Sequence, residues 1–256
     1  MESIFARTQM LFGAQGMECL ACAHVAVFGL GGVGGQAAET LVRAGVGQLT
    51  ICDNDTVSNT NRNRQLFVTA YTTGMVKTEA AAERLLAVNP DLKLHRRTCF
   101  FDRDTASAFD FSAYDYVLDC IDTVTSKLLL IDCCAEAGTP LLACLGTGNK
   151  TDPTRLQVSD ISKTSVCPLA RVMRLECKKR GYCHYRVVWS DEMPQQPDVT
   201  QTEELLAKGR RSIPASTPFV PPAAGILMAR TCVMDLLSGG CKSLKSGVIP
   251  KKYKPL

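Results

Sequence analysis

Short uninterrupted apolar runs alternate with longer apolar patterns of helical spacing through the first 150 residues. Runs that end in glycines or acids predict buried strands, whereas apolar residues that recur every three or four positions predict helices. Strands are expected at residues 24–32, 48–53, 92–100, 114–122 and 139–146, and helices at 33–46, 75–88 and 123–138. Strands that alternate with helices predict an α/β fold with a doubly wound, mostly parallel sheet.

The pattern changes after Thr147, where regular alternation of strands and helices stops. The further expected elements are strands at 155–161 and 184–190, a basic helix at 168–180 and an apolar helix at 223–240. Residues 190–222 are rich in proline, glutamine, threonine and charge, without a sustained apolar period. A connection of this length is usually functional or disordered, so we expect a long, mobile segment there.

Composition adds little to this picture. The apolar and charged fractions are ordinary, the formal net charge is +4, and no run approaches a membrane span of roughly 18 uncharged apolar residues. The opening "MESIFARTQMLFG" has no basic region followed by a long apolar run, so a signal peptide is not expected and the cytoplasm is the predicted location. Most of the thirteen cysteines lie in apolar runs, which predicts buried free thiols.

The first candidate for chemistry is "GLGGVG" at residues 29–34, directly after a predicted strand and before a predicted helix. Glycines in this setting let the backbone approach phosphate, while the helix dipole and free amides attract the anion. Asp53 follows about 20 residues later, the usual position of an acid that contacts a ribose. A Rossmann-like nucleotide site is expected; NAD is the conventional ligand, and a glycine turn with only a packing role is the alternative.

Four charged residues shift the prediction away from NAD. Arg62 and Arg64 follow the acid closely, Lys77 opens the next expected helix, and Asp122 follows the carboxyl end of a strand. Ligands of open α/β sheets bind at that edge. Cations with one carboxylate suit a triphosphate and Mg²⁺, since the cations neutralise charge as a phosphate leaves. A solvated loop is the alternative for both arginines, and Arg62 stays unassigned.

Five ordered motifs carry a resemblance to a known family. "GLGGVG", "DND", "NRNRQ", "GMVKTE" and "LDCIDT" occur within residues 5–150 in the order and spacing of one superfamily. The chain resembles the adenylating domain of the ubiquitin-activating, ThiF and MoeB superfamily. That resemblance implies adenylation of a carboxylate by ATP, with pyrophosphate as the leaving group.

The resemblance also implies roles for individual residues. It assigns Asn61, Arg64 and Lys77 to the phosphates and Asp122 to Mg²⁺. It assigns to adenosine and its surroundings Gly29, Gly31, Gly32, Gly34, Asp53 and Asp55. Arg7 takes the place of an arginine that reaches the partner subunit's site, which implies a homodimer and a catalytic role shared with Arg64, Lys77 and Asp122.

Relatives that adenylate ubiquitin-like sulfur carriers usually hold zinc with two late C-x-x-C pairs, since paired thiolates close a tetrahedral site. Here the C-x-x-C pair is Cys19 and Cys22, early in the chain, and the late cysteines form none. No zinc is therefore expected. Activation of the C-terminal glycine of a sulfur carrier remains the alternative function, and a non-catalytic nucleotide-binding module remains a third.

The second half instead resembles the bacterial tRNA threonylcarbamoyladenosine dehydratases, through "TDPTRLQVSDISKTSVCPLARVMRLECKKRG" and the loop spelling "TNRNRQ". That family implies ATP-dependent activation of the threonylcarbamoyl carboxylate on the adenosine beside the anticodon, followed by ring closure with net loss of water. It leaves a monovalent cation and a sulfur-transfer protein open as further partners, and a membrane is not expected.

Basic residues of the second half are candidates for phosphates of the tRNA. They include Lys163, Arg171 and Arg174, and a solvated helix face is the alternative for each. Lys127 is a candidate for the substrate carboxylate, with an ordinary exposed lysine as the alternative, whereas Trp189 and Tyr185 are expected to pack rather than to stack on bases. We thus expect one ThiF-type domain over 1–256, with a helical segment 1–23, an ATP-binding core 24–150 and a mixed or antiparallel, substrate-facing extension 151–256.

Overall fold

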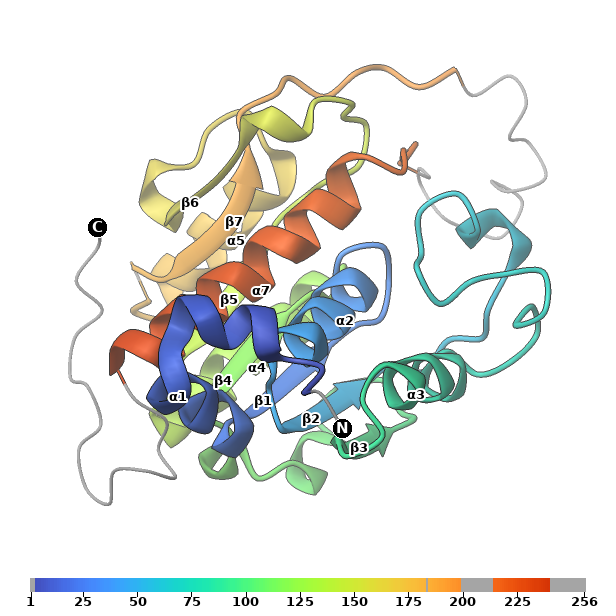
Figure 1. The fold of residues 1–256 in the computed structure, drawn as a ribbon. Coiled ribbons are helices and arrows are strands. Elements are labelled where there is room, and N and C mark those ends of the chain that lie inside the picture. Colours follow the sequence, from blue (N-terminus) through green and yellow to red (C-terminus); the bar gives the residue numbers. More distant parts are fainter. Residues whose placement is uncertain (1–2, 183, 199–213, 240–256) are drawn as a thin grey trace.

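The computed structural model describes residues 3–182, 184–198 and 214–239, and Figure 1 shows their arrangement around one sheet. The sheet has seven strands in the order β3-β2-β1-β4-β5-β7-β6. All neighbouring strands are parallel except β6 and β7, which are antiparallel. The strands are β1 His24–Phe28, β2 Gln48–Cys52, β3 Lys93–Arg97, β4 Tyr116–Asp119, β5 Leu141–Cys144, β6 Leu156–Asp160 and β7 Arg186–Ser190.

This topology confirms the predicted doubly wound, mostly parallel sheet. The mixed part also appears where the sequence predicts it, because β7 pairs in parallel with β5 and then in antiparallel with β6. The C-terminal extension therefore adds two strands to the same sheet. Of the connection expected at 190–222, residues 199–213 lie outside the described residues, and the prediction that it is mobile falls mainly on them.

Helices cover both faces of the sheet. They are α1 Ala6–Cys22, α2 Gly34–Ala44, α3 Lys77–Val88, α4 Val124–Ala137, α5 Pro168–Lys179 and α7 Val220–Gly239, with short 3₁₀ turns η1 Asn59–Asn61, η2 Ala106–Ala108, η3 Phe111–Ala113, η4 Pro153–Arg155 and η5 Ile161–Lys163. Side chains of β1 alternate between the two faces, as strand geometry requires. Val25 and Val27 join the core beneath α1, α2, α3 and α7, whereas Ala26 and Phe28 join the core beneath α4 and α5.

The last helix, α7, is long and apolar enough to span a membrane by length and composition. It contains Arg230 and Asp235, so it is not a run of uncharged apolar residues. More than half of that window, 56%, is buried inside the protein, because α7 packs against α2 and the sheet (Figure 1). Gly225 permits this contact, since a Cβ at that position would overlap the carbonyl oxygen of Val33 at the start of α2. Burial on several sides explains the apolar composition.

Candidate nucleotide site at the carboxyl edge of the sheet

The loop between β1 and α2 contains two glycines, Gly29 and Gly34, that no other residue replaces without strain. Gly29 has a φ of 90°, and a Cβ there would lie 2.7 Å from the carbonyl oxygen of Cys120. A Cβ on Gly34 would overlap the carbonyl oxygen of Gly29, whereas one on Gly31 would meet open space. The loop is thus tight where it packs and open at Gly31, which leaves room for a phosphate near the N-terminus of α2.

Asp53, directly after β2, holds this loop in place. Its Oδ2 accepts a hydrogen bond of 2.6 Å from the amide of Leu30, and its Oδ1 accepts one of 2.8 Å from the amide of Asp55. Charge-assisted hydrogen bonds of this kind are among the stronger ones in proteins. The acid predicted to meet the nucleotide therefore also ties the end of β2 to the glycine loop.

Lys77, the first residue of α3, lies beside the same acid. Its ammonium is 2.7 Å from Oδ2 of Asp55 and 3.8 Å from Oδ1 of Asp53. The lysine side chain is 8% exposed, whereas that of Asp55 is 61% exposed. The cation thus lies at the rim of the site and shares its charge with a carboxylate that faces solvent.

The two arginines of the loop after β2 occupy different surroundings. Arg64 is half-buried and packs against the glycine loop, with its Cγ 3.4 Å from the Cβ position of Gly32. Its guanidinium donates to the carbonyl oxygen of Thr60 at 3.1 Å, and burial lowers the pKa of Arg64. Arg62 is exposed. Of the two arginines, Arg64 is therefore the one that lies against the glycine loop.

Asn61 shapes the loop that presents Arg64. Its carbonyl oxygen accepts hydrogen bonds from the amides of Arg64 at 3.1 Å and Gln65 at 2.9 Å. Asn63, two residues on, donates its side-chain amide to the carbonyl oxygen of Ser216 at 2.9 Å. The loop is thus connected to the segment that leads into α7.

Asp122 completes the group at this edge. It lies in the turn between β4 and α4, and it is exposed. The turn abuts the glycine loop, because the Cβ position of Gly29 is 3.2 Å from the amide nitrogen of Ile121. Mg²⁺ is commonly held by one or two carboxylates together with substrate phosphates, and an exposed carboxylate beside a phosphate-binding loop suits that arrangement. Within the described ranges, no group of three or more His, Cys, Asp or Glu side chains is placed to hold a metal by itself.

Arg7 is not brought to this edge within the same chain. It is exposed on α1, two residues from Phe5, which packs beside Gly45. Gly45 follows the C-terminus of α2, so it lies at the opposite edge of the sheet from the glycine loop. A contact between Arg7 and a nucleotide therefore requires a second subunit.

Lys127 is not exposed, and its ammonium faces buried partners rather than solvent. Its side chain is 0% exposed, and its ammonium is 3.0 Å from Oδ1 of Asp119, which is also 0% exposed. It donates a second hydrogen bond, of 2.7 Å, to the carbonyl oxygen of Cys144. Position in the sequence alone does not show that this lysine lies beneath the strand ends.

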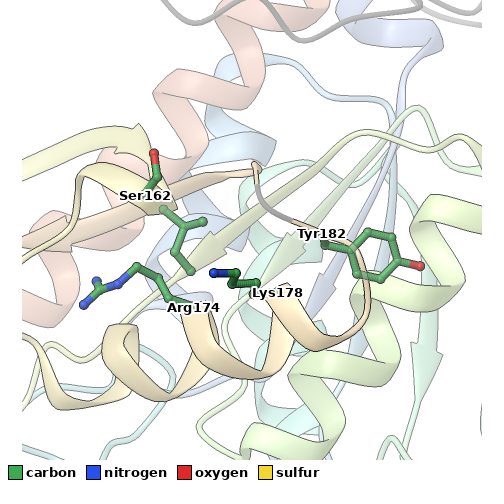
Figure 2. Close-up of a pocket in the computed structure, with 5 residues that line it drawn as sticks. Ser162, Arg174, Lys178 and Tyr182 are labelled. Carbon is green, nitrogen blue, oxygen red and sulfur yellow. The ribbon is translucent and has the colours of Figure 1, made fainter.

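Some basic residues of the second half are exposed, and others hydrogen-bond to the protein itself. Lys163 and Arg171 are exposed and form no ion pair within the described residues. Arg174 donates to the carbonyl oxygen of Thr164 at 2.9 Å and also to its hydroxyl. Figure 2 shows Arg174 and Lys178 beside Ser162 and Tyr182, around a shallow pocket that Ile161 also lines.

The two aromatic residues considered for stacking face the protein instead. Trp189 is 4% exposed and donates its indole N–H to the hydroxyl of Ser159 at 2.8 Å. Tyr185 packs partly buried against the core on the α5 side, and burial raises the pKa of its hydroxyl. The prediction that both residues pack is confirmed.

Asn149 is a residue that the sequence-based prediction missed. Its backbone amide donates a hydrogen bond of 2.7 Å to the carbonyl oxygen of Ala215, and its side-chain oxygen accepts one of 2.7 Å from the amide of Ala215. Its carbonyl oxygen accepts a third, of 2.8 Å, from the amide of Gln195. It thus joins the two ends of the long connection beside the nucleotide edge. Its φ of 59° is left-handed, which asparagine tolerates well, so the "GN" pair between β5 and η4 signals a turn but not this contact.

The cysteines of the described part are free thiols, as predicted. Cys19 is buried, and its thiol lies 3.5 Å from the carbonyl oxygen of Leu236. The absence of zinc stays a prediction.

Comparison with known proteins agrees with this geometry. The sequence matches the ThiF family over residues 5–244. It is 38% identical over 240 residues to the tRNA threonylcarbamoyladenosine dehydratase of Bacillus subtilis (strain 168), which covers 91% of this chain and 94% of that protein. The adenylyltransferase and sulfurtransferase MOCS3 of Drosophila willistoni is 39% identical over 141 residues, but these are 55% of this chain and 30% of that protein.

A solved structure extends the similarity to three dimensions. The crystal structure of the E. coli tRNA N6-threonylcarbamoyladenosine dehydratase, TcdA, in complex with ATP superposes with a TM-score of 0.82 at 31% identity, over 92% of this chain and 94% of that one. The fold, the motifs and the family match agree over nearly the whole length. The chain belongs to the ThiF family.

Proposed function

We propose that this protein is an ATP-dependent dehydratase that acts on threonylcarbamoyladenosine in tRNA. The observation that carries the proposal is the convergence, at one edge of the sheet, of the open glycine loop, Arg64 against Gly32, and the Asp122 turn. Similarity to dehydratases over nine-tenths of the chain supports this substrate. Similarity to the sulfur-carrier activator covers only 55% of the chain and favours that alternative less.

The geometry suits carboxylate activation. The adenosine lies along the glycine loop and Asp53, and the phosphates face the N-terminus of α2, Arg64 and Lys77. A substrate carboxylate oxygen attacks the α-phosphorus, the bond to the β-phosphate oxygen breaks, and pyrophosphate leaves with its charge neutralised by the two cations. Mg²⁺ held near Asp122 supplies further charge neutralisation when bound. A heteroatom of the same threonylcarbamoyl group then attacks the activated carbonyl, and AMP leaves.

A homodimer and a tRNA surface form part of the same proposal. Arg7 lies at the far edge of its own sheet, so we infer that it serves the site of a second subunit. Exposed Lys163 and Arg171 are placed to meet tRNA phosphates, since they have no ion-pair partner among the described residues. A sulfur-transfer protein as a further partner, a monovalent cation and a cytoplasmic location remain proposals that rest on the family resemblance.

Mass analysis of nucleosides tests the reaction. tRNA that carries threonylcarbamoyladenosine is incubated with the protein, ATP and Mg²⁺, then digested. The expected result is a nucleoside lighter by one water, with one AMP and one pyrophosphate formed per product. An unchanged nucleoside in the presence of folded, ATP-binding protein contradicts the dehydratase function.

One further reaction tests the sulfur-carrier alternative, and one binding measurement tests the tRNA surface. Replacing tRNA with a ubiquitin-like sulfur carrier yields a stable acyl-adenylate only if the protein activates that carboxylate. Arg171→Ala is expected to lower the dependence of tRNA affinity on salt by about one ion per site, because each phosphate contact releases one counterion. Arg180→Ala is the control, since Arg180 is already paired with Asp132 at 2.9 Å.

A further inference from the structure

A fully buried ion pair lies directly beneath the candidate site. Lys127, in the first turn of α4, is 3.0 Å from Asp119 at the end of β4, and both side chains are 0% exposed. Burial raises the pKa of Asp119, and the adjacent ammonium of Lys127 opposes that change. Apolar residues of similar volume often leave a protein equally stable or more stable than such a pair. Stability alone therefore does not account for two charges at this place.

The carboxylate of Asp119 holds Ile121, one neighbour of Asp122, and the backbone amide of Lys127 holds Thr123, the other. Oδ1 of Asp119 accepts a hydrogen bond of 3.1 Å from the amide of Ile121, and the amide of Lys127 donates one of 3.0 Å to the carbonyl oxygen of Thr123. Asp122 lies between these two anchored residues. Its own carboxylate, by contrast, is exposed and receives one long hydrogen bond of 3.3 Å from the hydroxyl of Thr123.

The same ammonium also holds the next strand. Its 2.7 Å hydrogen bond ends at the carbonyl oxygen of Cys144, the last residue of β5. The chain continues from Cys144 through Gly146 to Asn149, the residue that joins both ends of the long connection. One buried lysine thus connects the turn that carries Asp122 with the loop that borders the rest of the site.

We propose that Lys127 is a positioning residue that acts through Asp119 to fix Asp122 for Mg²⁺ and through Cys144 to fix the β5 loop against it. The inference rests on the proposed function only as far as Mg²⁺ and ATP are concerned. Partners that orient a metal ligand often matter nearly as much as the ligand, because they set its direction.

The test removes both charges at once, so that neither remains buried alone. In the double variant Asp119→Asn/Lys127→Met, the asparagine retains an oxygen that accepts from Ile121, and methionine replaces the lysine stem. Urea unfolding measures stability, and calorimetric titration of ATP at several Mg²⁺ concentrations measures the Mg²⁺ needed for half-maximal binding. The expected result is a folded protein whose Mg²⁺ requirement rises about tenfold or more, the usual effect of losing such a partner.

Controls separate positioning from a general structural effect. Glu39→Gln/Arg84→Met removes an ion pair of 2.8 Å between α2 and α3 and is expected to leave the Mg²⁺ requirement unchanged. If the first double variant does not fold, Asp119→Asn/Lys127→Gln, which keeps a donor toward Cys144 with neither charge buried, replaces it in the same titration. An unchanged Mg²⁺ requirement in the folded variant overturns the proposal. Wild-type protein that binds ATP with Mg²⁺ but does not alter tRNA overturns the dehydratase function alone.

Discussion

Lys77 and Lys127, each in the first turn of a helix, differ in whether their carboxylate partner is exposed or buried. Lys77 begins α3 at the rim, and its nearest partner, Asp55, is 61% exposed. Lys127 lies in the first turn of α4, and its partner Asp119 is 0% exposed. Both lysines were predicted from the sequence to meet ligand charge. Only the first is placed where a phosphate can compete with its carboxylate.

The two lysines differ in what stabilises the partner carboxylate when the lysine is withdrawn. Solvent stabilises Asp55 when Lys77 turns toward a phosphate, so that exchange of partners costs little. No solvent reaches Asp119, and removal of its partner leaves a buried charge uncompensated. The rim lysine therefore suits chemistry in which charge moves, whereas the buried lysine suits a geometry that must not move.

The largest expected effect breaks the buried pair from one side. Lys127→Met is expected to lower the free energy of unfolding by about 3–5 kcal/mol, because Asp119 is left buried and unpaired. Urea denaturation of the purified variant measures this change. A decrease in the free energy of unfolding below about 1 kcal/mol, the range of exposed ion pairs, would contradict the difference drawn between Lys127 and Lys77.

Lys77→Met is expected to act on turnover rather than on stability. Loss of one cation that stabilises a leaving phosphate costs on the order of 3 kcal/mol in the barrier, or about a hundredfold in rate. ATP–pyrophosphate exchange with substrate present measures the rate, AMP binding measures adenosine affinity, and Arg64→Ala is expected to behave in the same way. Equal losses of AMP affinity and turnover would contradict a role at the phosphate end.

Asp55→Asn sharpens the contrast at the rim. The substitution removes the closest carboxylate from Lys77, so the ratio of ATP affinity to AMP affinity is expected to rise. The stability change is expected to stay below about 1 kcal/mol, because Asp55 is largely exposed. Parallel calorimetric titrations with the two nucleotides measure the ratio. A fall in both affinities would instead make Asp55 a direct ligand of the adenosine.

The smallest effect concerns the pair of Glu39 and Arg84, remote from the site. Burial raises the pKa of Glu39, but hydrogen bonds from Arg84 and Arg43 outweigh it and leave the pKa below 4.5. A carboxyl group with a lowered pKa stabilises the fold above its unfolded pKa, and this contribution is lost as the pH falls through the folded pKa. Glu39→Gln is therefore expected to flatten the acid limb of stability below pH 4.5 and change little at pH 7, as thermal unfolding across pH will show.

The sequence predicts the sheet well because buried parallel strands read as short apolar runs with clear ends. The strand "QLTIC" and the glycine loop were placed correctly, since both depend on local residue types. The start of α7 was missed by three residues, because Val220 and the prolines after it resemble the preceding connection. Proline in the first turn is compatible with a helix, so composition alone misplaces this boundary.

The site was predictable where one segment carries the information, and not where two distant segments meet. Arg64 and Lys77 follow from motifs within one stretch, although the pairing of Lys77 with Asp55 does not. The burial of Lys127 was not predicted, because its partner Asp119 on β4 and its acceptor Cys144 on β5 lie 8 and 17 positions away in the sequence. Asn149 joins residues on either side of the connection, and no local pattern describes such a contact.

Gly225 has a consequence for the order in which the protein becomes functional during synthesis. Its missing side chain lets α7 dock on Val33, at the start of the helix that begins in the glycine loop. Domains are made from the N-terminus, so the nucleotide motifs leave the ribosome long before the helix that buttresses them. We therefore expect a nascent chain that lacks α7 to bind ATP more weakly than the folded protein.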